Sequence, residues 1–218
     1  MTYLQIRQDE EIRTYIERAD AALRALGYTE HSQAHVCRVA EEAGRILSTL
    51  GYSERDVEIV KIAGYLHDIG NVINRHNHSQ SGALMAFSLL RERGFDACDT
   101  ADIMTAIGNH DEGAGTPVSA IAAALILADK SDVRRSRVRN ADPATFDIHD
   151  RVNFAVERSA LTLDVQARTV TLTLSIDAAQ CSIMDYFEIF LTRMLLCRKA
   201  AEKLGLQFKL IINEQAMI

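Results

Sequence analysis

The sequence has little of what marks a secreted or membrane-spanning protein. Its 218 residues include four cysteines and only two prolines. The cysteines are widely separated, form no CxxC pair and mostly lie among apolar residues, which predicts buried thiols in a reducing compartment. Residues 1–20 hold no apolar core of signal-peptide length, and no later run reaches about 18 uncharged apolar residues. We therefore expect a cytoplasmic protein without a membrane partner.

The chain also lacks an excess of basic residues. It has 24 Lys and Arg against 30 Asp and Glu, a net charge of -6, which argues against nucleic-acid binding by the whole surface. A local basic stretch, residues 130–139, nevertheless gathers five of the 24 basic side chains. Hydrophobic residues make up 48% and charged residues 25%, which is ordinary for a globular protein.

Apolar residues recur every three or four positions from residue 8 to about residue 134. This spacing predicts consecutive amphipathic helices. Caps, glycines and the proline at position 117 place the expected helices at residues 9–26, 29–51, 53–68, 81–94, 96–108 and 117–135, with a loop at 70–77.

The pattern changes in the last third of the chain. Residues 161–177 alternate apolar and polar side chains, which predicts a β-hairpin, and they are followed by an expected helix at 181–205 and a strand at 206–214. Such a small β-β-α-β unit cannot bury both faces of its sheet alone, so it should pack on the helices or form a homodimer. The sequence predicts a mainly α fold: a helical domain at 1–139, then a small α+β subdomain at 140–218 whose first residues, 140–150, form the link.

Six of the seven histidines lie in the first 110 residues, several of them beside aspartates. His35 falls within the second expected helix, His67 and Asp68 end the third, His110 ends the fifth, and Asp129 interrupts the apolar run of the sixth. Antiparallel helices can bring such positions to one depth, and imidazole and carboxylate are ligands for zinc, iron and manganese. An ionised carboxylate in a core-facing helix needs a cation or an arginine partner. The pattern indicates a metal site.

Five short motifs occur in a fixed order along the helices: HVCRVAEEA from His35, YLHDIG at 65–70, HSQSGA from His78, AIGNHDEG around His110, and LADK around Asp129. In this order they resemble the motifs of the HD superfamily of metal-dependent phosphohydrolases, over roughly residues 20–139. A lone His-Asp pair would be weak evidence, whereas the ordered series is specific.

The resemblance implies an HD-type helical bundle in which His35, His67, Asp68 and Asp129 hold one metal. In branches with two additional histidines, matched here by His78 and His110, Asp68 bridges to a second metal. The spacing is closest to the two-metal branch that includes bacterial diadenosine tetraphosphate hydrolases. The metal could be Fe, Mn, Zn, Mg, Co or Ni.

Two nearby histidines are left outside this set. His76 competes with His78 for one role, and the SGA that follows favours His78. His31 lies one helical turn before His35 and is expected at the surface or against a ligand residue.

The chain departs from the HD enzymes that act on cyclic dinucleotides. It has HDIGN where many of those enzymes have HDIGK, so Asn71 supplies no cation, and NHDEGAGTP only partly matches their HHE and GYP elements. A cyclic dinucleotide phosphodiesterase is therefore disfavoured.

The function expected from these residues is hydrolysis of a small phosphate ester or anhydride, foremost a nucleotide, by a metal-bound hydroxide, with Asp68 as the central catalytic residue. Phosphate oxygens are expected on Arg75, Lys130, Arg134 or Arg135. Two alternatives stay open at this point. One is a catalytically silent nucleotide sensor, and the other is a di-iron oxygenase, because the same ligands suit iron.

Overall fold

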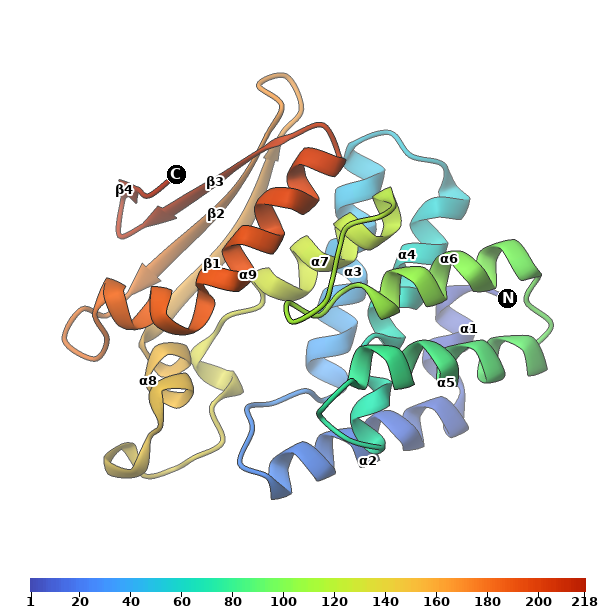
Figure 1. Cartoon of the computed structure of the whole chain (residues 1–218), viewed down its shortest axis with the longest axis horizontal. Coiled ribbons are helices and arrows are strands. Elements are labelled where there is room, and N and C mark those ends of the chain that lie inside the picture. Colours follow the sequence, from blue (N-terminus) through green and yellow to red (C-terminus); the bar gives the residue numbers. More distant parts are fainter.

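The computed structural model describes the backbone of residues 1–218 and every side chain except that of Pro143. Helices fill the first 131 residues, and a four-stranded sheet with one long helix forms the C-terminal part (Figure 1). The helices of the bundle are α1 (Tyr3–Gln8), α2 (Glu10–Ala25), α3 (Gln33–Thr49), α4 (Glu54–Leu66), α5 (His78–Glu92), α6 (Ala97–Gly108) and α7 (Ala120–Ser131), with short 3₁₀ helices at Ile69–Val72, Arg135–Arg137 and Pro143–Thr145. In the described part of the chain, no helix is both long and apolar enough to cross a membrane.

Several helix ends differ from the expected ones, for local reasons. The second predicted helix begins at Gln33 instead of residue 29, because the backbone N–H of Glu30 donates to the carbonyl of Arg137 and Ser32 caps the helix. The fourth begins three residues earlier than expected, at His78, directly after Asn77 with its left-handed φ of 59°. The sixth ends at Ser131, so Arg134 and Arg135 lie beyond the helix.

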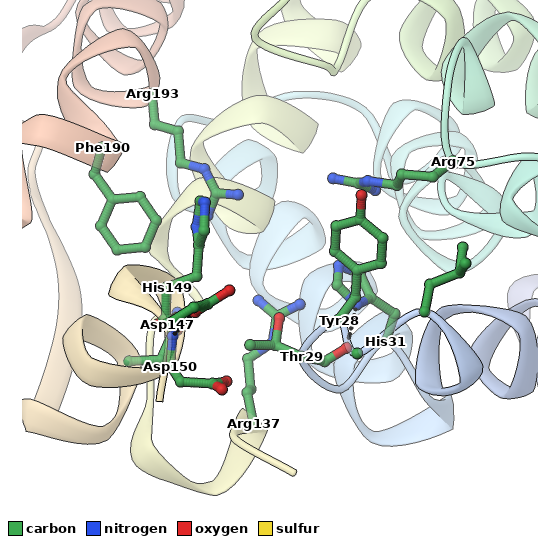
Figure 2. A pocket seen from close by; sticks show the side chains of 13 residues that line it. Tyr28, Thr29, His31, Arg75, Arg137, Asp147, His149, Asp150, Phe190 and Arg193 are labelled. Atoms are coloured by element: carbon green, nitrogen blue, oxygen red, sulfur yellow. Dashed lines mark hydrogen bonds between the residues drawn. The ribbon is translucent and has the colours of Figure 1, made fainter. Parts of the chain in front are cut away.

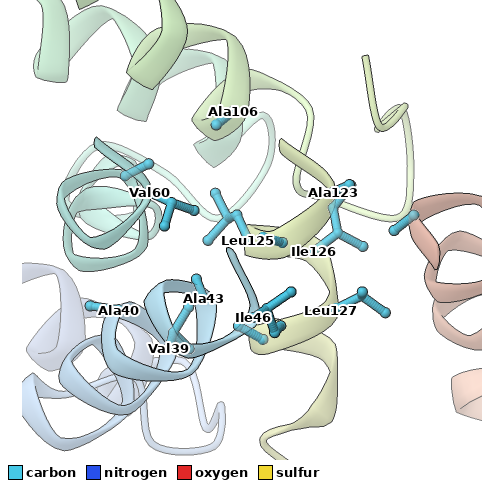
Figure 3. Close-up of a cluster of buried hydrophobic side chains, with 14 of the residues drawn as sticks. Val39, Ala40, Ala43, Ile46, Val60, Ala106, Ala123, Leu125, Ile126 and Leu127 are labelled. Carbon is cyan, nitrogen blue, oxygen red and sulfur yellow. The ribbon is translucent and has the colours of Figure 1, made fainter. Parts of the chain in front are cut away.

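Helix α7 forms the centre of the bundle. Every residue from Ile121 to Ala128 is buried, so this helix is apolar on all sides and is covered by α3, α4, α6 and α9. Figure 3 shows Leu125 on the side of α7 that faces Val60 of α4, and Ile126 and Leu127 on the opposite side. Asp129, one residue beyond this apolar run, is thereby fixed deep in the molecule.

The C-terminal part contains α8 (Ile148–Ala155), β1 (Val156–Asp164), β2 (Thr169–Ile176), α9 (Ile183–Lys203), β3 (Gln207–Ile212) and β4 (Gln215–Ala216). The sheet order is β1-β2-β3-β4; β2 and β3 are parallel, with Val170 opposite Phe208, and the other pairs are antiparallel. The expected β-β-α-β order is present, but β1 begins five residues earlier than predicted. Two short elements, α8 and β4, were not predicted from the sequence.

Helix α9 joins the two parts of the molecule. It packs on α7 of the bundle and on β3 of the sheet, and α8 lies against its N-terminal half (Figure 1). The Ser159 hydroxyl of β1 also donates to the carbonyl of Ser131 at 2.7 Å. The sheet unit therefore packs on the helices of its own chain, and the homodimer stays a prediction.

Two glycines allow the close approaches that bring the histidines together. A Cβ on Gly64 would lie 2.8 Å from the Cα of Ala40, so α3 and α4 can cross tightly only with glycine there. A Cβ on Gly70 would lie 2.1 Å from the carbonyl oxygen of His78 and 2.5 Å from the nitrogen of Gly82. The turn after Asp68 thus packs against the first turn of α5.

Replacing Gly70 with Ala should force these backbones apart and destabilise the fold by about 2–3 kcal/mol. For a chain of this size, the melting temperature should fall by roughly 5–10 °C. Gly108→Ala is the matched control, because its nearest neighbour would be Ala83 Cβ at 3.8 Å. Equal melting temperatures for the two variants would contradict the close approach at Gly70.

Candidate metal centre

Six ionisable side chains from five helices and their ends meet in the middle of the bundle. His35 comes from α3, His67 and Asp68 follow α4, His78 opens α5, His110 lies just beyond α6, and Asp129 belongs to α7. His35 and His67 are fully buried, and Asp68 exposes only 5% of its surface. These are the six residues that the ordered motifs single out.

Asp68 lies between two sets of histidines. Its Oδ2 is 3.3 Å from Nε2 of His67 and 3.7 Å from Nε2 of His35. Its Oδ1 faces the other way, 3.4 Å from Nε2 of His78 and 4.0 Å from Nε2 of His110. Ligand atoms on one cation, each at about 2.0–2.2 Å from it, have separations of this order. One carboxylate could therefore bridge two cations.

Asp129 completes the first set. Its Oδ1 is 3.4 Å from Nε2 of His35 and 3.7 Å from Nε2 of His67, and ligand atoms of these three residues lie within 4.8 Å of one another. A second group within the same limit is formed by His67, Asp68 and His110.

The four histidines present the same ring nitrogen to the centre. The Nδ1 of His67 is 2.7 Å from the carbonyl of Gly64, that of His110 is 2.7 Å from the carbonyl of Ile107, and that of His78 is 3.1 Å from the carbonyl of Arg75. His35 Nδ1 is 2.8 Å from Oδ2 of Asp132. Carbonyl and carboxylate oxygens only accept hydrogen bonds, so each Nδ1 carries a proton, and the Nε2 of each ring is the nitrogen that can offer a lone pair to a cation.

These lone pairs fit a cation. The Nε2 atoms of His35 and His67 are buried and make no hydrogen bond to any described residue. The Nε2 atoms of His78 and His110 lie only 3.2 Å apart, and two unprotonated nitrogens at this distance repel unless a positive charge lies beside them. Imidazole and carboxylate suit divalent Fe, Mn, Zn, Co and Ni, so the donor set fits the expected metals.

The charges of the site also favour a cation. Burial by itself raises the pKa of Asp68, but His67 and its neighbours outweigh burial and hold that pKa well below its usual range. Burial lowers the pKa of His67, yet Asp68 and Asp129 raise it to about 10. The carboxylates of Asp68 and Asp129 thus stabilise a positive charge between them. A metal ion would supply this charge in place of the proton on His67.

Asp132 contacts a proposed ligand, and the sequence reasoning missed it. It accepts the Nδ1 proton of His35 and is held in turn by Nε of Arg134 at 2.9 Å. Burial opposes ionisation, but the hydrogen bond from His35 keeps the pKa of Asp132 low. Its position three residues after Asp129, in the motif DKSD, is the signal that could have revealed it.

A chain of ion pairs links Asp129 to the C-terminal helix. Lys130 Nζ lies 2.8 Å from Oδ2 of Asp129 and 2.6 Å from Oε2 of Glu112, and Arg193 Nε of α9 lies 2.8 Å from Oε1 of Glu112. Burial raises the pKa of Glu112, but Lys130 and Arg193 together hold it below the usual range. Lys130 therefore orients the Asp129 carboxylate and is not free to reach for a substrate.

The remaining arginines named from the sequence have different places. Arg75 Nη1 lies 4.0 Å from Oδ1 of Asp68, and its guanidinium stacks 5.7 Å from the ring of Tyr28. Arg134 pairs with Asp132 and Glu30, whereas Arg135 donates to the carbonyl of Phe154 and covers its ring. A cavity lies between the bundle and the C-terminal part, beside the cluster of histidines and aspartates. Neither Arg134 nor Arg135 is among the described residues that line it.

The structure also places the two histidines that were left outside the ligand set, His76 and His31. His76 is exposed in the loop before α5, on a different hollow of the surface. His31 lies against a proposed ligand, which is one of its two expected places: its Nδ1 is 2.7 Å from the carbonyl of Thr29, and its Nε2 is 4.0 Å from Oδ2 of Asp68. It lies between the cluster of histidines and aspartates and an open cavity.

That cavity, of about 370 Å³, lies between the bundle and the C-terminal part. His31 and Arg75 line its inner end beside the cluster, and α8 and α9 supply the opposite wall (Figure 2). Arg137 and Arg193 also line it. Sequence reasoning did not single out either arginine for this role.

Comparison with known proteins agrees with the geometry. A family model described as the HD domain matches residues 33–141, half of the chain, and the protein belongs to this family. An uncharacterized protein of Methanocaldococcus jannaschii, MJ1020, is 26% identical over 184 residues, which span 72% of this chain and 70% of that protein. Ribonuclease Y of Lawsonia intracellularis is 33% identical over 105 residues, 48% of this chain and only 18% of that enzyme.

One solved structure is also similar. The crystal structure of a predicted HD superfamily hydrolase from an uncultured Thermotogales bacterium is 28% identical and covers 57% of this chain and 67% of its own, with a TM-score of 0.46. The family match places this protein in the HD superfamily of metal-dependent hydrolases, and the cluster of histidines and aspartates is of the kind that can hold a metal ion.

The hydrogen bond from His35 to Asp132 allows a direct test of the contacts that orient the proposed ligands. Asp132→Asn keeps the size of the side chain but removes the carboxylate that accepts the Nδ1 proton of His35 and orients its ring. Metal affinity, measured by competition with a chelator, should fall by roughly 10- to 100-fold. Asp102→Asn, on the exposed face of α6, should leave it unchanged. Equal affinities of the two variants would refute a role for Asp132.

The placement of His76 and His78 allows the second metal position to be tested. Replacing His78 with Ala should lower the metal content of protein purified without chelator by about one ion per chain, because a ligand facing Oδ1 of Asp68 is lost. His76→Ala is the control and should retain the full content. If elemental analysis shows the loss in the His76 variant instead, the assignment of His78 is wrong.

Proposed function

We propose that this protein is a metal-dependent phosphohydrolase that cleaves a small phosphate ester or anhydride, with a nucleotide as the first candidate. One observation carries the proposal: the two oxygens of the buried Asp68 carboxylate face two separate sets of histidine Nε2 atoms. The proposed metal ligands are His35, His67, Asp68, His78, His110 and Asp129.

Divalent cations held in this way lower the pKa of a water molecule and neutralise charge that develops on phosphorus. The residues of the chain set the conditions for that chemistry. Asp68 fixes the separation of the two positions, and Lys130 turns Oδ1 of Asp129 toward His35 and His67 by binding Oδ2. Arg75, 4.0 Å from Asp68, is placed to bind a phosphate oxygen beside the cluster.

A small substrate agrees with the rest of the molecule better than a polymer does. The net charge of -6 gives the surface as a whole no attraction for nucleic acid. Positive side chains gather instead inside the cavity that opens onto the cluster, where a compact anion can enter.

Replacing Asp68 with Ala should remove both metal retention and hydrolysis, because each proposed position loses a ligand. The measurement is elemental analysis together with phosphate release from a panel of nucleotides and simple phosphate esters. The exposed Asp102→Ala should keep both properties. Phosphate release by the Asp68 variant at the wild-type rate would refute the assignment, and a wild-type protein that binds a nucleotide without cleaving it would be a sensor.

A further inference from the structure

The cavity beside the metal cluster is built by both parts of the chain. Its inner end is formed by His31 and Arg75 of the helical bundle, which both contact the region of Asp68. Its far wall is formed by Phe190 and Arg193 of α9 and by Asp147 and Asp150 at the start of α8. The site is therefore incomplete without residues 147–193.

Three guanidinium groups reach into this cavity from three sides (Figure 2). Arg193 uses Nε on Glu112, and Arg75 has only a long 3.4 Å hydrogen bond from Nη1 to Asn71. Arg137 spends Nε on the carbonyl of Glu30 and Nη1 on the carbonyl of Asp132. Each arginine therefore retains at least one terminal nitrogen that makes no hydrogen bond within the described chain.

Arg137 is the most informative of the three. Its residue is only 4% exposed, and its two hydrogen bonds go to neutral carbonyls, while the nearest carboxylate oxygen of Asp132 is 4.0 Å away. Burial lowers the pKa of Arg137, as expected for a positive charge with little compensation. A buried cation turned toward an open cavity is stabilised when an anion fills it.

The far end of the cavity has the opposite character. Asp150 is 7% exposed and Asp147 caps α8, and neither forms an ion pair with any described lysine, arginine or histidine. Burial raises the pKa of Asp150, and the negative charge of the neighbouring Asp147 acts in the same direction. These carboxylates can accept hydrogen bonds from hydroxyl or amino groups of a ligand.

We propose that Arg75, Arg137 and Arg193 bind the phosphate group of the substrate, and that α8 and α9 select its body. The ligand class is a compact phosphate ester whose body carries hydroxyl or amino donors toward Asp147 and Asp150. The orientation of the bound ligand, with its phosphate toward Asp68, rests on the proposed function. A cavity of about 370 Å³ lies near the lower end of small-molecule sites, which favours a single compact molecule.

The pair between Arg193 and Glu112 also has a simpler interpretation, which is that it only fastens α9 to the bundle. Nothing in that interpretation requires phosphate to bind more weakly when Arg193 is changed. A direct measurement of anion binding therefore separates the two roles.

The probe is inorganic phosphate, titrated by calorimetry into the full-length, metal-loaded protein. Arg193→Gln should weaken binding roughly 10- to 100-fold, because a charged hydrogen-bond donor is lost. Arg198→Gln is the matched control, since it removes the same charge from an exposed position of α9. Arg193→Lys keeps the charge but not the planar pair of donors, so its affinity should fall between the two.

The outcomes separate this proposal from the proposed function. If no phosphate ester is cleaved but phosphate still binds in an Arg193-dependent way, the phosphohydrolase assignment fails and the pocket stands. If esters are cleaved while Arg193→Gln binds phosphate as the wild type does, the pocket assignment is overturned. Loss of affinity in Arg198→Gln as large as in Arg193→Gln would also overturn it, and metal content measured in each variant identifies effects through Asp129.

The selection of the body is tested with a matched pair of ligands, O-phosphoethanolamine and ethyl phosphate. Asp147→Asn removes the negative charge and keeps an equally good cap for α8, so the fold should be preserved. It should weaken binding of the amine severalfold and leave ethyl phosphate unchanged. Equal effects on the two ligands, or none, would contradict a role for this wall in selection.

Discussion

The structure depends on one buried carboxylate. Asp68 has lost nearly all contact with water, and the imidazoles of His67 and His35 on one side and of His78 and His110 on the other replace that solvation. An ionised group in such surroundings is costly unless positive charge compensates it. This requirement explains why side chains from separate helices must meet at the same depth. The glycine in the turn after Asp68 lets that turn pack against α5 and so brings His78 close to Asp68.

The contacts around the ligands extend the same logic outward. Asp132 fixes His35, Lys130 fixes Asp129, and Glu112 joins Lys130 to Arg193 of α9. Each link is an ion pair or a charged hydrogen bond in a region with little water, where such interactions are stronger than at the surface. The C-terminal part is thus connected to the candidate metal centre by charge as well as by packing, although it contributes none of the six proposed ligands.

Much of the site could be predicted from the sequence, because its residues occur in a fixed order at helix ends and in one apolar helix. Asp129 was informative because a carboxylate after such a run needs a partner. Arg137 and Arg193 were not predictable, since a basic residue in a polar segment or on an amphipathic helix carries no sign of what it faces after folding. Helix α8 was missed for a similar reason: its eight residues give too short a periodic signal.

The central helix α7 has a further consequence for how this protein can vary. The residues from Ile121 to Ala128 of α7 are buried on every side, and α9 covers one of these sides. Without α9, this side of the bundle would be an exposed hydrophobic surface that favours self-association. The helical part therefore cannot be combined with an arbitrary C-terminal segment. Any sequence that replaced the C-terminal segment to change selectivity would have to bring its own apolar helix of matching contour, which confines variation of the pocket wall to the few positions that face inward.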